Sequence, residues 1–225
     1  MSQTEPRRRR RTLTKEKIEA AVEWAYRQAI DGAPPFFASA EELANDYLNR
    51  SDSLDKAVKS LIRHQTAKAS TTGFLTGLGG VITLPVAVPA SLASVLFVQM
   101  RMIGAIAYMC GYDPRTDQVK TLLYMCLAGN GMQKIAASAG LDISKKMAVS
   151  GIKAIPGKAL IDINKKVGFR LFTKFGQKGA VNLGKMVPLA GGAVGAAVDG
   201  SSTYTVGRAA KRLFVGGMTD IRSSN

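Results

Sequence analysis

The residue types that most often carry acid–base or nucleophilic chemistry are scarce in this chain. His64 is the only histidine, so a Ser-His-Asp or Cys-His arrangement would have to use it. No nucleophile elbow of the G-x-S-x-G kind lies near it, and a catalytic base needs an identifiable partner. We therefore interpret His64 as an exposed or core-edge residue and predict no catalytic residue.

Metal and nucleotide sites have no recognisable pattern either. Asp113 and Asp117 are the one close pair of aspartates in the second half, and capping of a predicted helix explains their position. The run from Gly151 to Ala159 departs from a phosphate-binding loop in its spacing, lacks the Ser or Thr that holds Mg²⁺, and follows no strand. Cys110 and Cys126 lie in apolar runs without metal-site spacing, which predicts buried thiols in a reducing compartment. We expect no metal and no cofactor.

One constellation of polar residues stands inside apolar sequence. Arg101 and Asp199 are solitary opposite charges in the two most apolar predicted helices, and a low-dielectric core strongly disfavours an unpaired charge. We expect them to pair, or to line one polar cavity together with Gln99 and Asn130. In the alternative interpretation, Arg101 reaches the surface and Asp199 caps a kink.

Positive charge dominates the composition. The chain holds 31 Lys and Arg against 16 Asp and Glu, a formal net charge of +15. Such a field attracts anionic lipid headgroups or nucleic-acid phosphates. The segment from 143 to 185 carries most of the candidates for lipid or anion binding, which are Lys145, Lys146, Lys153, Lys158, Lys165, Lys166, Arg170, Lys174 and Lys178, assisted by Phe172 and Phe175.

A second basic cluster lies near the N-terminus, where Arg7–Arg11 are five consecutive arginines. Such a block of like charges predicts a disordered arm over residues 1–12. The arm either assists electrostatic anchoring or is a solubilising tail. No apolar signal-peptide region precedes it, so we expect a cytoplasmic protein.

Helices must position these side chains. Residues 69–100 are free of charged side chains, and Pro85 and Pro89 divide this apolar stretch. The piece from Ala90 to Tyr112 is long enough to cross a membrane, but Gln99 and Arg101 lie near its middle. We predict a helical hairpin over 69–112, and leave open whether it is buried in the fold or inserts into a bilayer.

The remaining periodicity is also helical. Helices are predicted at 14–30, from a capping box at Ser39, from Ser51 or Ser53, and over 114–129, 132–138, 143–155, 160–167 and 186–215, with a short helix or a loop at 168–179. Few runs have strand character, which predicts an all-α, compact multi-helix domain around the central Gly- and Pro-containing hairpin. We divide the chain into the 1–12 arm, N-terminal helices at 13–50, the main domain at 51–215 and a tail at 216–225.

Several short blocks together resemble the EcsC family of bacterial proteins, from about Leu54 to Phe214. They include Thr72-Gly73-Phe74, Leu78-Gly79-Gly80, Thr83-Leu84-Pro85, Gln99-Met100-Arg101-Met102, Gly111-Tyr112-Asp113, Gly168-Phe169-Arg170-Leu171, Asn182-Leu183, Val187-Pro188-Leu189 and Gly192 to Asp199. The resemblance implies an intracellular bacterial protein associated with an ABC-transporter operon. The family is sometimes labelled a hydrolase or protease, and it supplies no catalytic set to carry over.

These features predict a non-enzymatic protein that binds anionic membrane lipids through a Lys- and Arg-rich face, peripheral on the inner face of the cell membrane. It would support a membrane transport or secretion process, and a membrane protein complex is a further expected partner. One alternative is a lipid or peptide hydrolase with a polar site near Gln99, Arg101 and Asp113. Another is nucleic-acid binding through the Arg tract, although no binding module supports it.

Overall fold

The computed structural model describes residues 13–32, 34, 37–70, 88–143, 149–177 and 188–216, with side chains placed for 151–175 and 198–216 in the last two ranges. The predicted all-α class is confirmed, and these ranges contain no β-strand. The elements are α1 (Lys15–Asp31), α2 (Ala40–Asn49), α3 (Leu54–Ala69), α5 (Ala90–Met109), α6 (Asp117–Leu127), η1 (Gly129–Gly131), α7 (Met132–Ser138), α8 (Val149–Lys153), α9 (Gly157–Phe172), η2 (Thr173–Gln177), α11 (Pro188–Ala210) and η3 (Lys211–Val215).

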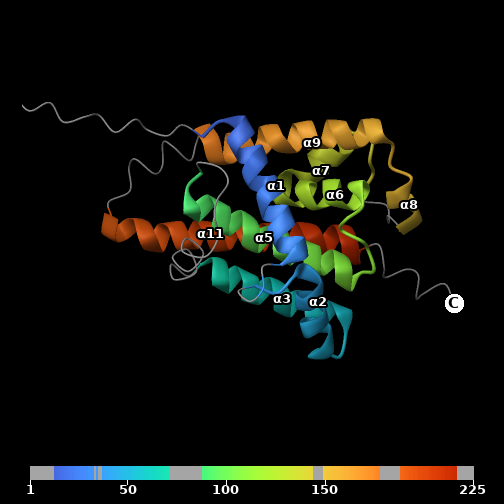
Figure 1. Ribbon diagram of the computed structural model, residues 1–225, viewed down its shortest axis with the longest axis horizontal. Helices are drawn as coiled ribbons and strands as arrows, with labels where there is room; N and C mark the ends of the chain where they lie inside the picture. Colours follow the sequence, from blue (N-terminus) through green and yellow to red (C-terminus); the bar gives the residue numbers. More distant parts are fainter. Residues whose placement is uncertain are drawn as a thin grey trace, which may run out of the picture.

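Helix α5 forms the centre of the molecule, where it packs against α1, α2, α3, α6 and α11. Figure 1 shows α9 along one edge of the fold and α2 and α3 at the opposite edge. Helix α5 begins at Ala90, as predicted for the second arm of the hairpin. Residues 71–87 of the first arm lie outside the described residues.

Among the described helices, α5 is the one long and apolar enough to cross a membrane. Yet 83% of its most apolar window is buried by the protein itself. Phe97 in its first half is fully buried, and its ring lies 6.5 Å from that of Trp24 and 5.3 Å from that of Phe37. The core helix of a soluble domain has the same composition, so α5 is explained by its packing.

Capping residues set the helix starts as predicted. The Thr14 hydroxyl accepts a hydrogen bond from the Lys17 amide at the start of α1. At α2 both halves of the capping box are present, because Ser39 Oγ accepts from the Glu42 amide at 3.1 Å and Glu42 Oε2 accepts from the Ser39 amide at 2.7 Å. Ser53 caps α3. Local sequence therefore fixes where the first three helices begin.

The predicted start of the helix at Pro114 is wrong by one turn. Helix α6 begins at Asp117, and Asp113 instead closes the preceding turn, where its Oδ1 accepts from the Arg115 amide at 2.9 Å. The Pro114 carbonyl accepts a hydrogen bond from Tyr26 Oη at 3.0 Å. This tertiary contact with α1 holds the turn outside the helix.

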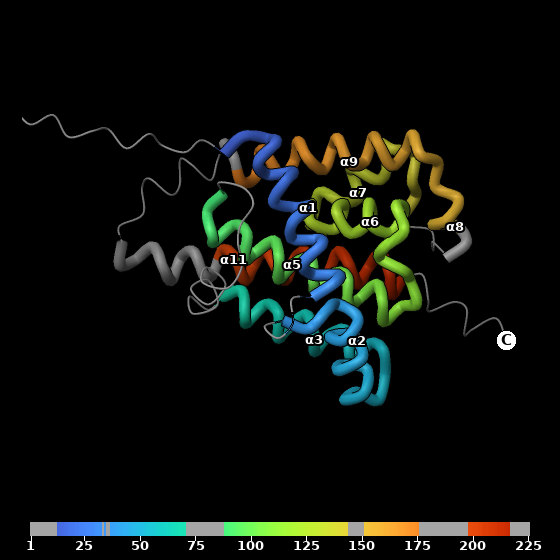
Figure 2. Tube along the Cα trace, viewed as in Figure 1, coloured from blue at the N-terminus to red at the C-terminus, as the bar shows by residue number. Residues whose placement is uncertain are grey.

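Gly168 does not end a helix, contrary to the sequence interpretation, because α9 continues through it to Phe172. A Cβ atom on Gly168 would lie 2.6 Å from Glu19 Oε1 of α1. The carboxylate of Glu19 therefore lies directly against the backbone of α9 at this glycine. Figure 2 shows the first turns of α1 lying beside the C-terminal part of α9, although the two segments are far apart in sequence.

The last helix packs on the apolar centre as predicted, since α11 contacts both α3 and α5. A Cβ atom on Gly207 would lie 2.9 Å from two side-chain carbons of Ile62 and 3.1 Å from Met102 Sδ. Small residues on α11 thus allow three helix backbones to come close together.

Candidate functional site

The outer face of α9 combines exposed apolar and basic side chains. Ile161 and Phe169 are 69% and 65% exposed, the two highest values among the large hydrophobic residues whose side chains are described. Lys158 and Lys165 are exposed on the same helix. At 100° per residue, these four positions fall within about 80° of one another around the helix axis. We call Lys158, Ile161, Lys165 and Phe169 the α9 stripe.

The six predicted basic residues that the structure describes do not form one face. Lys145, Lys146 and Lys178 lie outside the described residues, and Lys153 is exposed on α8. Lys166 Nζ donates to the Ser138 carbonyl and hydroxyl, both at 2.8 Å. Arg170 lies against Gly131 of η1, and Lys174 donates to Ser202. Five of this set are exposed and form no ion pair with another described residue, namely Lys153, Lys158, Lys165, Arg170 and Lys174. Of these five, Arg170 and Lys174 are held against neighbouring elements by the contacts just described.

The predicted aromatic contacts need a correction. Phe172 and Phe175 are partly buried and pack against the hydrophobic core, whereas Phe169 is exposed. Residues three apart on a helix are about 60° apart around it, so a set of three such residues turns away from a single face. Two of the three phenylalanines therefore pack against the core. The exposed one is the residue that the list of candidates omitted.

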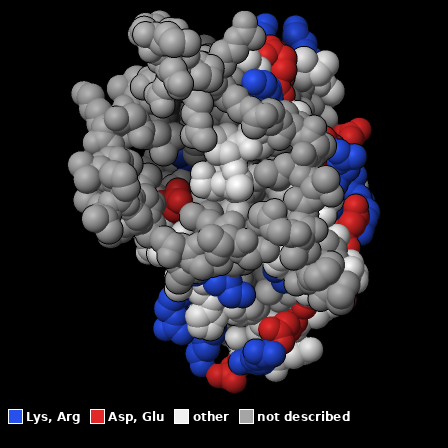
Figure 3. All heavy atoms as spheres, turned by 60° about the vertical axis from the view of Figure 1, so that its left-hand side comes forward, with Lys and Arg blue, Asp and Glu red and all other residues white. Residues whose placement is uncertain are grey.

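Elsewhere on the described surface the two signs of charge are mixed. Figure 3 shows Lys, Arg, Asp and Glu side chains interspersed along the edges of one face. Helix α3 is also rich in basic residues, but Lys56 pairs with Asp52 at 2.8 Å and Lys59 pairs with Asp55 at 2.6 Å. No large hydrophobic side chain is exposed on α3. The α9 stripe therefore differs from α3 in two ways. Its lysines have no ion-pair partner among the described residues, and it exposes large hydrophobic side chains.

The predicted interior pair of Arg101 with Asp199 is wrong, because no ion pair joins these two described residues. Burial lowers the pKa of Arg101, and the charges of Glu42 and Tyr47 partly oppose that shift. Its Nε atom is buried without a hydrogen-bond partner. Gln99 lies two positions earlier on α5, so it points to the opposite side of the helix. The two residues cannot line one cavity.

Gln99 belongs instead to a polar cluster between α5, α11 and η2. Its Nε2 donates to Ser202 Oγ and to Thr203 Oγ1, both at 3.2 Å, and its Oε1 is buried without a partner. Lys174 Nζ donates to Ser202 Oγ at 2.8 Å. Asp199 lies close enough to interact with Lys174 through space, although the two form no direct ion pair. We call Gln99, Lys174, Asp199, Ser202 and Thr203 the polar cluster.

Burial governs the ionisation of this cluster. Burial by surrounding protein atoms lowers the pKa of Lys174 to about 8. The charge of Arg170 adds to this shift, and the charge of Asp199 opposes it. Lys174 nevertheless keeps exposed surface along its side chain. Burial raises the pKa of Asp199, and Lys174 opposes that shift. Each charged group is therefore stabilised by the other and destabilised by its surroundings.

The hydrogen bond between Lys174 and Ser202 is the contact from which Ser-Lys nucleophiles are built. Ser202, however, lies within α11, where backbone N–H groups are used by the helix. The described residues around it offer no pair of free backbone donors for an oxyanion. The cluster is explained as a packing contact that fixes η2 and α11 against α5.

The other predicted polar residues lie apart from the cluster. His64 is exposed, as expected, with Nδ1 2.8 Å from Tyr47 Oη. Asn130 is exposed on η1, and Asp113 is exposed beyond the end of α5. Gln99, Arg101 and Asp113 thus do not converge, which removes the geometric basis of the hydrolase alternative at that place.

Both cysteines are free and buried, as predicted. Burial raises the pKa of Cys110 to about 12 and raises that of Cys126 as well. No group of His, Cys, Asp and Glu side chains suited to a metal ion occurs among the residues that the structure places.

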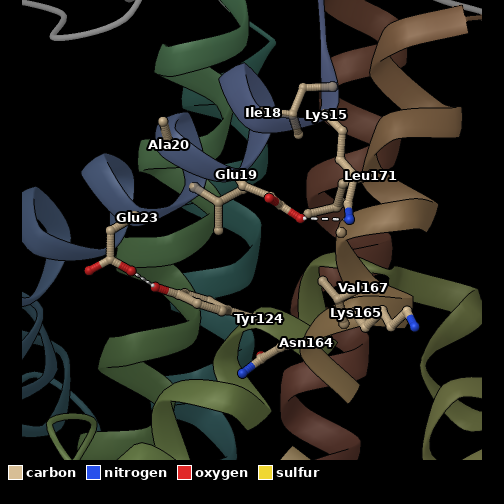
Figure 4. A pocket seen from close by; sticks show the side chains of 12 residues that line it. Lys15, Ile18, Glu19, Ala20, Glu23, Tyr124, Asn164, Lys165, Val167 and Leu171 are labelled. Carbon is tan, nitrogen blue, oxygen red and sulfur yellow. Dashed lines mark hydrogen bonds and ion pairs between the residues drawn. The ribbon is translucent and has the colours of Figure 1, made fainter. Parts of the chain in front are cut away.

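A half-open groove of about 500 Å³ separates α1 from α6 and α9. Figure 4 shows Glu23 and Tyr124 at one side and Lys165 and Leu171 at the other. Glu23 accepts hydrogen bonds from Lys120 Nζ at 2.9 Å and from Tyr124 Oη at 2.7 Å. Burial raises the pKa of Glu23, but these two bonds outweigh it and the net shift is downward. Sequence reasoning missed the groove, because α1 and α9 are far apart in the chain.

The comparisons with known proteins give one result. The chain matches the EcsC protein family over residues 10–215 of its 225 residues. Neither the curated proteins nor the solved structures gave a match. The match extends the resemblance seen in the short sequence blocks to almost the whole chain, from the end of the Arg tract to the last turn of η3. The chain therefore belongs to the EcsC protein family.

Proposed function

We propose that this protein docks on anionic membrane surfaces through the α9 stripe. The observation that carries the proposal is the exposure of Ile161 and Phe169 together with Lys158 and Lys165 on one helix face. Interfacial helices combine apolar side chains that enter the headgroup region with basic side chains that meet lipid phosphates. Figure 1 shows α9 at the edge of the fold, which is where docking on a flat surface requires it to be.

The charge balance of the segment supports the same proposal. Helices α8 and α9 with η2 contain six basic residues, Lys153, Lys158, Lys165, Lys166, Arg170 and Lys174, against the single acid Asp162. A basic residue near an anionic leaflet contributes about 1 kcal/mol. The unpaired lysines bring the protein to the surface, and the apolar side chains prolong its residence there.

This mode of binding requires no insertion of α5, which is already buried by the fold. It is consistent with a peripheral protein at the inner face of a cell membrane, where anionic lipids border a reducing compartment. We further propose that the bound protein supports a transport or secretion process by contacting a membrane protein complex.

Co-sedimentation with vesicles tests the proposal. The wild-type protein is expected to sediment with phosphatidylglycerol-containing vesicles at low salt and to be released as the salt concentration rises. It should not sediment with phosphatidylcholine vesicles. Added duplex DNA should compete poorly if lipid is the preferred anion. Absence of binding to anionic vesicles at low salt, or complete displacement by DNA, would overturn the proposal.

Reversing two charges on the stripe should give a large effect. The variant Lys158→Glu/Lys165→Glu is expected to weaken vesicle binding by at least about tenfold, because each cation contributes about 1 kcal/mol. Neither lysine has an ion-pair partner among the described residues, so the fold should tolerate the change. The measurement is the fraction of protein sedimented against lipid concentration.

The matched control is Arg63→Glu/Arg212→Glu, which makes the same change in net charge on exposed positions of α3 and η3, where neither arginine has an ion-pair partner among the described residues. If vesicle binding responds only to net charge, both double variants will lose the same affinity, and the α9 stripe has no special role. Equal losses would therefore contradict the proposal. A clear difference between the two variants supports it.

A further inference from the structure

Two unpaired hydrogen-bond donors lie where α2, α3 and α5 pack against one another. Gln65 of α3 is only 2% exposed, and its Nε2 atom is buried without a hydrogen-bond partner. Arg101 of α5 is partly buried, its Nε atom is also unpartnered, and it forms no ion pair with another described residue. Buried donors in folded proteins are almost always hydrogen-bonded. These two atoms therefore call for an acceptor that the described residues do not supply.

Tyr47 of α2 connects the two donors. Burial raises the pKa of Tyr47, whereas the Gln65 side chain and the positive charge of Arg101 oppose that rise, so both groups lie near the Tyr47 hydroxyl. Tyr47 Oη lies 2.8 Å from Nδ1 of the exposed His64. Tyr47 and Arg101 each keep some exposed surface, so a ligand from solvent can reach this region beside His64.

The charge of the region selects the kind of acceptor. Arg101 carries a full positive charge, and the acid whose charge acts on it is Glu42. Glu42 forms no ion pair with Arg101, and its Oε2 accepts from the Ser39 amide at 2.7 Å. A guanidinium group is best satisfied by a carboxylate, whose two oxygens match two parallel N–H groups. The negative charge of Glu42 disfavours an anion with two charges, such as sulfate.

We propose that this region binds the carboxylate group of a small monoanionic ligand, with Arg101 as its bidentate partner and Gln65 Nε2 as a further donor. The ligand must be small, because the two unpaired atoms are buried between packed helices. Figure 1 shows α2 and α3 at the edge of the fold opposite α9, so this site is separate from the α9 stripe. The inference therefore does not depend on membrane docking.

A nuclear magnetic resonance titration with acetate, labelled with an isotope at the carboxyl carbon, tests this site. Acetate replaces chloride at constant ionic strength, so screening of the basic surface stays the same. The full-length protein is expected to broaden the acetate signal through one saturable site. Arg101→Lys keeps the positive charge but loses the bidentate edge, so it should weaken acetate binding by at least about tenfold.

Arg212→Lys is the matched control, because it makes the same substitution at an exposed arginine of η3 that has no ion-pair partner among the described residues. This variant should bind acetate as the wild type does. Equal weakening in the two variants would show that acetate only samples the basic surface, and lack of a saturable site in the wild type would show that acetate is not recognised. Either result would overturn the inference.

Two further variants test the neighbouring groups. Gln65→Leu removes the Nε2 donor at nearly constant volume and should also weaken acetate binding by about tenfold. Glu42→Gln keeps a side chain suited to the capping box but removes the negative charge near Arg101, so acetate should bind about threefold more tightly. Urea unfolding checks that each variant is folded. Unchanged binding by folded Arg101→Lys or Gln65→Leu, or no gain with Glu42→Gln, would contradict the proposed site.

Competition identifies the class of anion. Sulfate should displace the labelled acetate less effectively than unlabelled acetate does at the same ionic strength, because its second charge is repelled by Glu42. Stronger displacement by sulfate would contradict the assignment to a monocarboxylate.

Discussion

Phe97→Ala is expected to lower the free energy of unfolding by about 3–5 kcal/mol in buffer that contains neither lipid nor detergent. Phe97 is fully buried in α5, and its ring packs against those of Trp24 and Phe37. Removing the ring leaves a cavity at the contact of α1 with α5. Urea unfolding followed by circular dichroism measures the change.

Phe169→Ala is the control, since it removes the same ring from a 65% exposed position and should change stability by no more than about 0.5 kcal/mol. The comparison also decides whether α5 is a core helix in solution. If α5 were packed only within a bilayer, the two variants would have similar stabilities in lipid-free buffer, and the fold described above would be wrong.

A double-mutant cycle is expected to show that Asp199 is coupled to Lys174. Asp199→Leu alone leaves the Lys174 ammonium group without a nearby negative charge. Lys174→Met alone likewise leaves the Asp199 carboxylate without a nearby positive charge. The double variant should recover about 0.5–1 kcal/mol relative to the sum of the single changes, because the two charges interact through space without a direct ion pair and Lys174 keeps exposed surface. Chemical unfolding of the four proteins measures this coupling free energy.

The matched cycle pairs Asp199→Leu with Arg101→Met, and those two changes should add to within about 0.5 kcal/mol. A larger coupling to Arg101 than to Lys174 would reverse our assignment. The pH dependence gives an independent check. Because the pKa of Lys174 falls from 10.5 to about 8 on folding, the unfolded chain holds the proton more tightly between those values. The stability of the wild type relative to Lys174→Met should therefore rise from pH 8 to pH 10.5.

Much of the fold could be predicted from sequence, because its signals are local. The Ser39 capping box, the glycine after Asp31 and the apolar run from Ala90 each fix an element without reference to the rest of the chain. Gly32 adopts φ of 77°, and a Cβ there would lie 2.9 Å from the Ser39 amide nitrogen, so a side chain would fit poorly.

The predicted helix boundaries were wrong where tertiary contacts, not local sequence, determine the structure. Gly168 looked like a helix end, but α9 continues through it, and only the folded chain places Glu19 opposite it. Asp113 looked like a cap, but the bond from Tyr26 to the Pro114 carbonyl holds its turn outside the helix. Neither partner is close in sequence, so no local pattern could identify it.

The cavity predicted to be lined by both Gln99 and Arg101, by contrast, could have been excluded earlier. Gln99 and Arg101 are two positions apart on one helix, so their side chains point in nearly opposite directions. The same reasoning would have separated Phe169 from Phe172, which lie about 60° apart around α9. Applying helical geometry to each candidate set, before choosing residues by type, would have selected Ile161 and Phe169 with Lys158 and Lys165.

The most direct test of membrane docking places an environment-sensitive fluorophore at residue 169. Cys110 and Cys126 are buried with raised pKa values, so a thiol-reactive nitrobenzoxadiazole label should react selectively with Phe169→Cys. Tyr204→Cys is the control, because Tyr204 is 50% exposed but lies on α11. If the α9 stripe docks on the membrane, anionic vesicles will shift the emission of the label at residue 169 to shorter wavelength. The emission of the label at residue 204 will not change. An unshifted label at 169 on protein that sediments with the vesicles would contradict docking through the stripe.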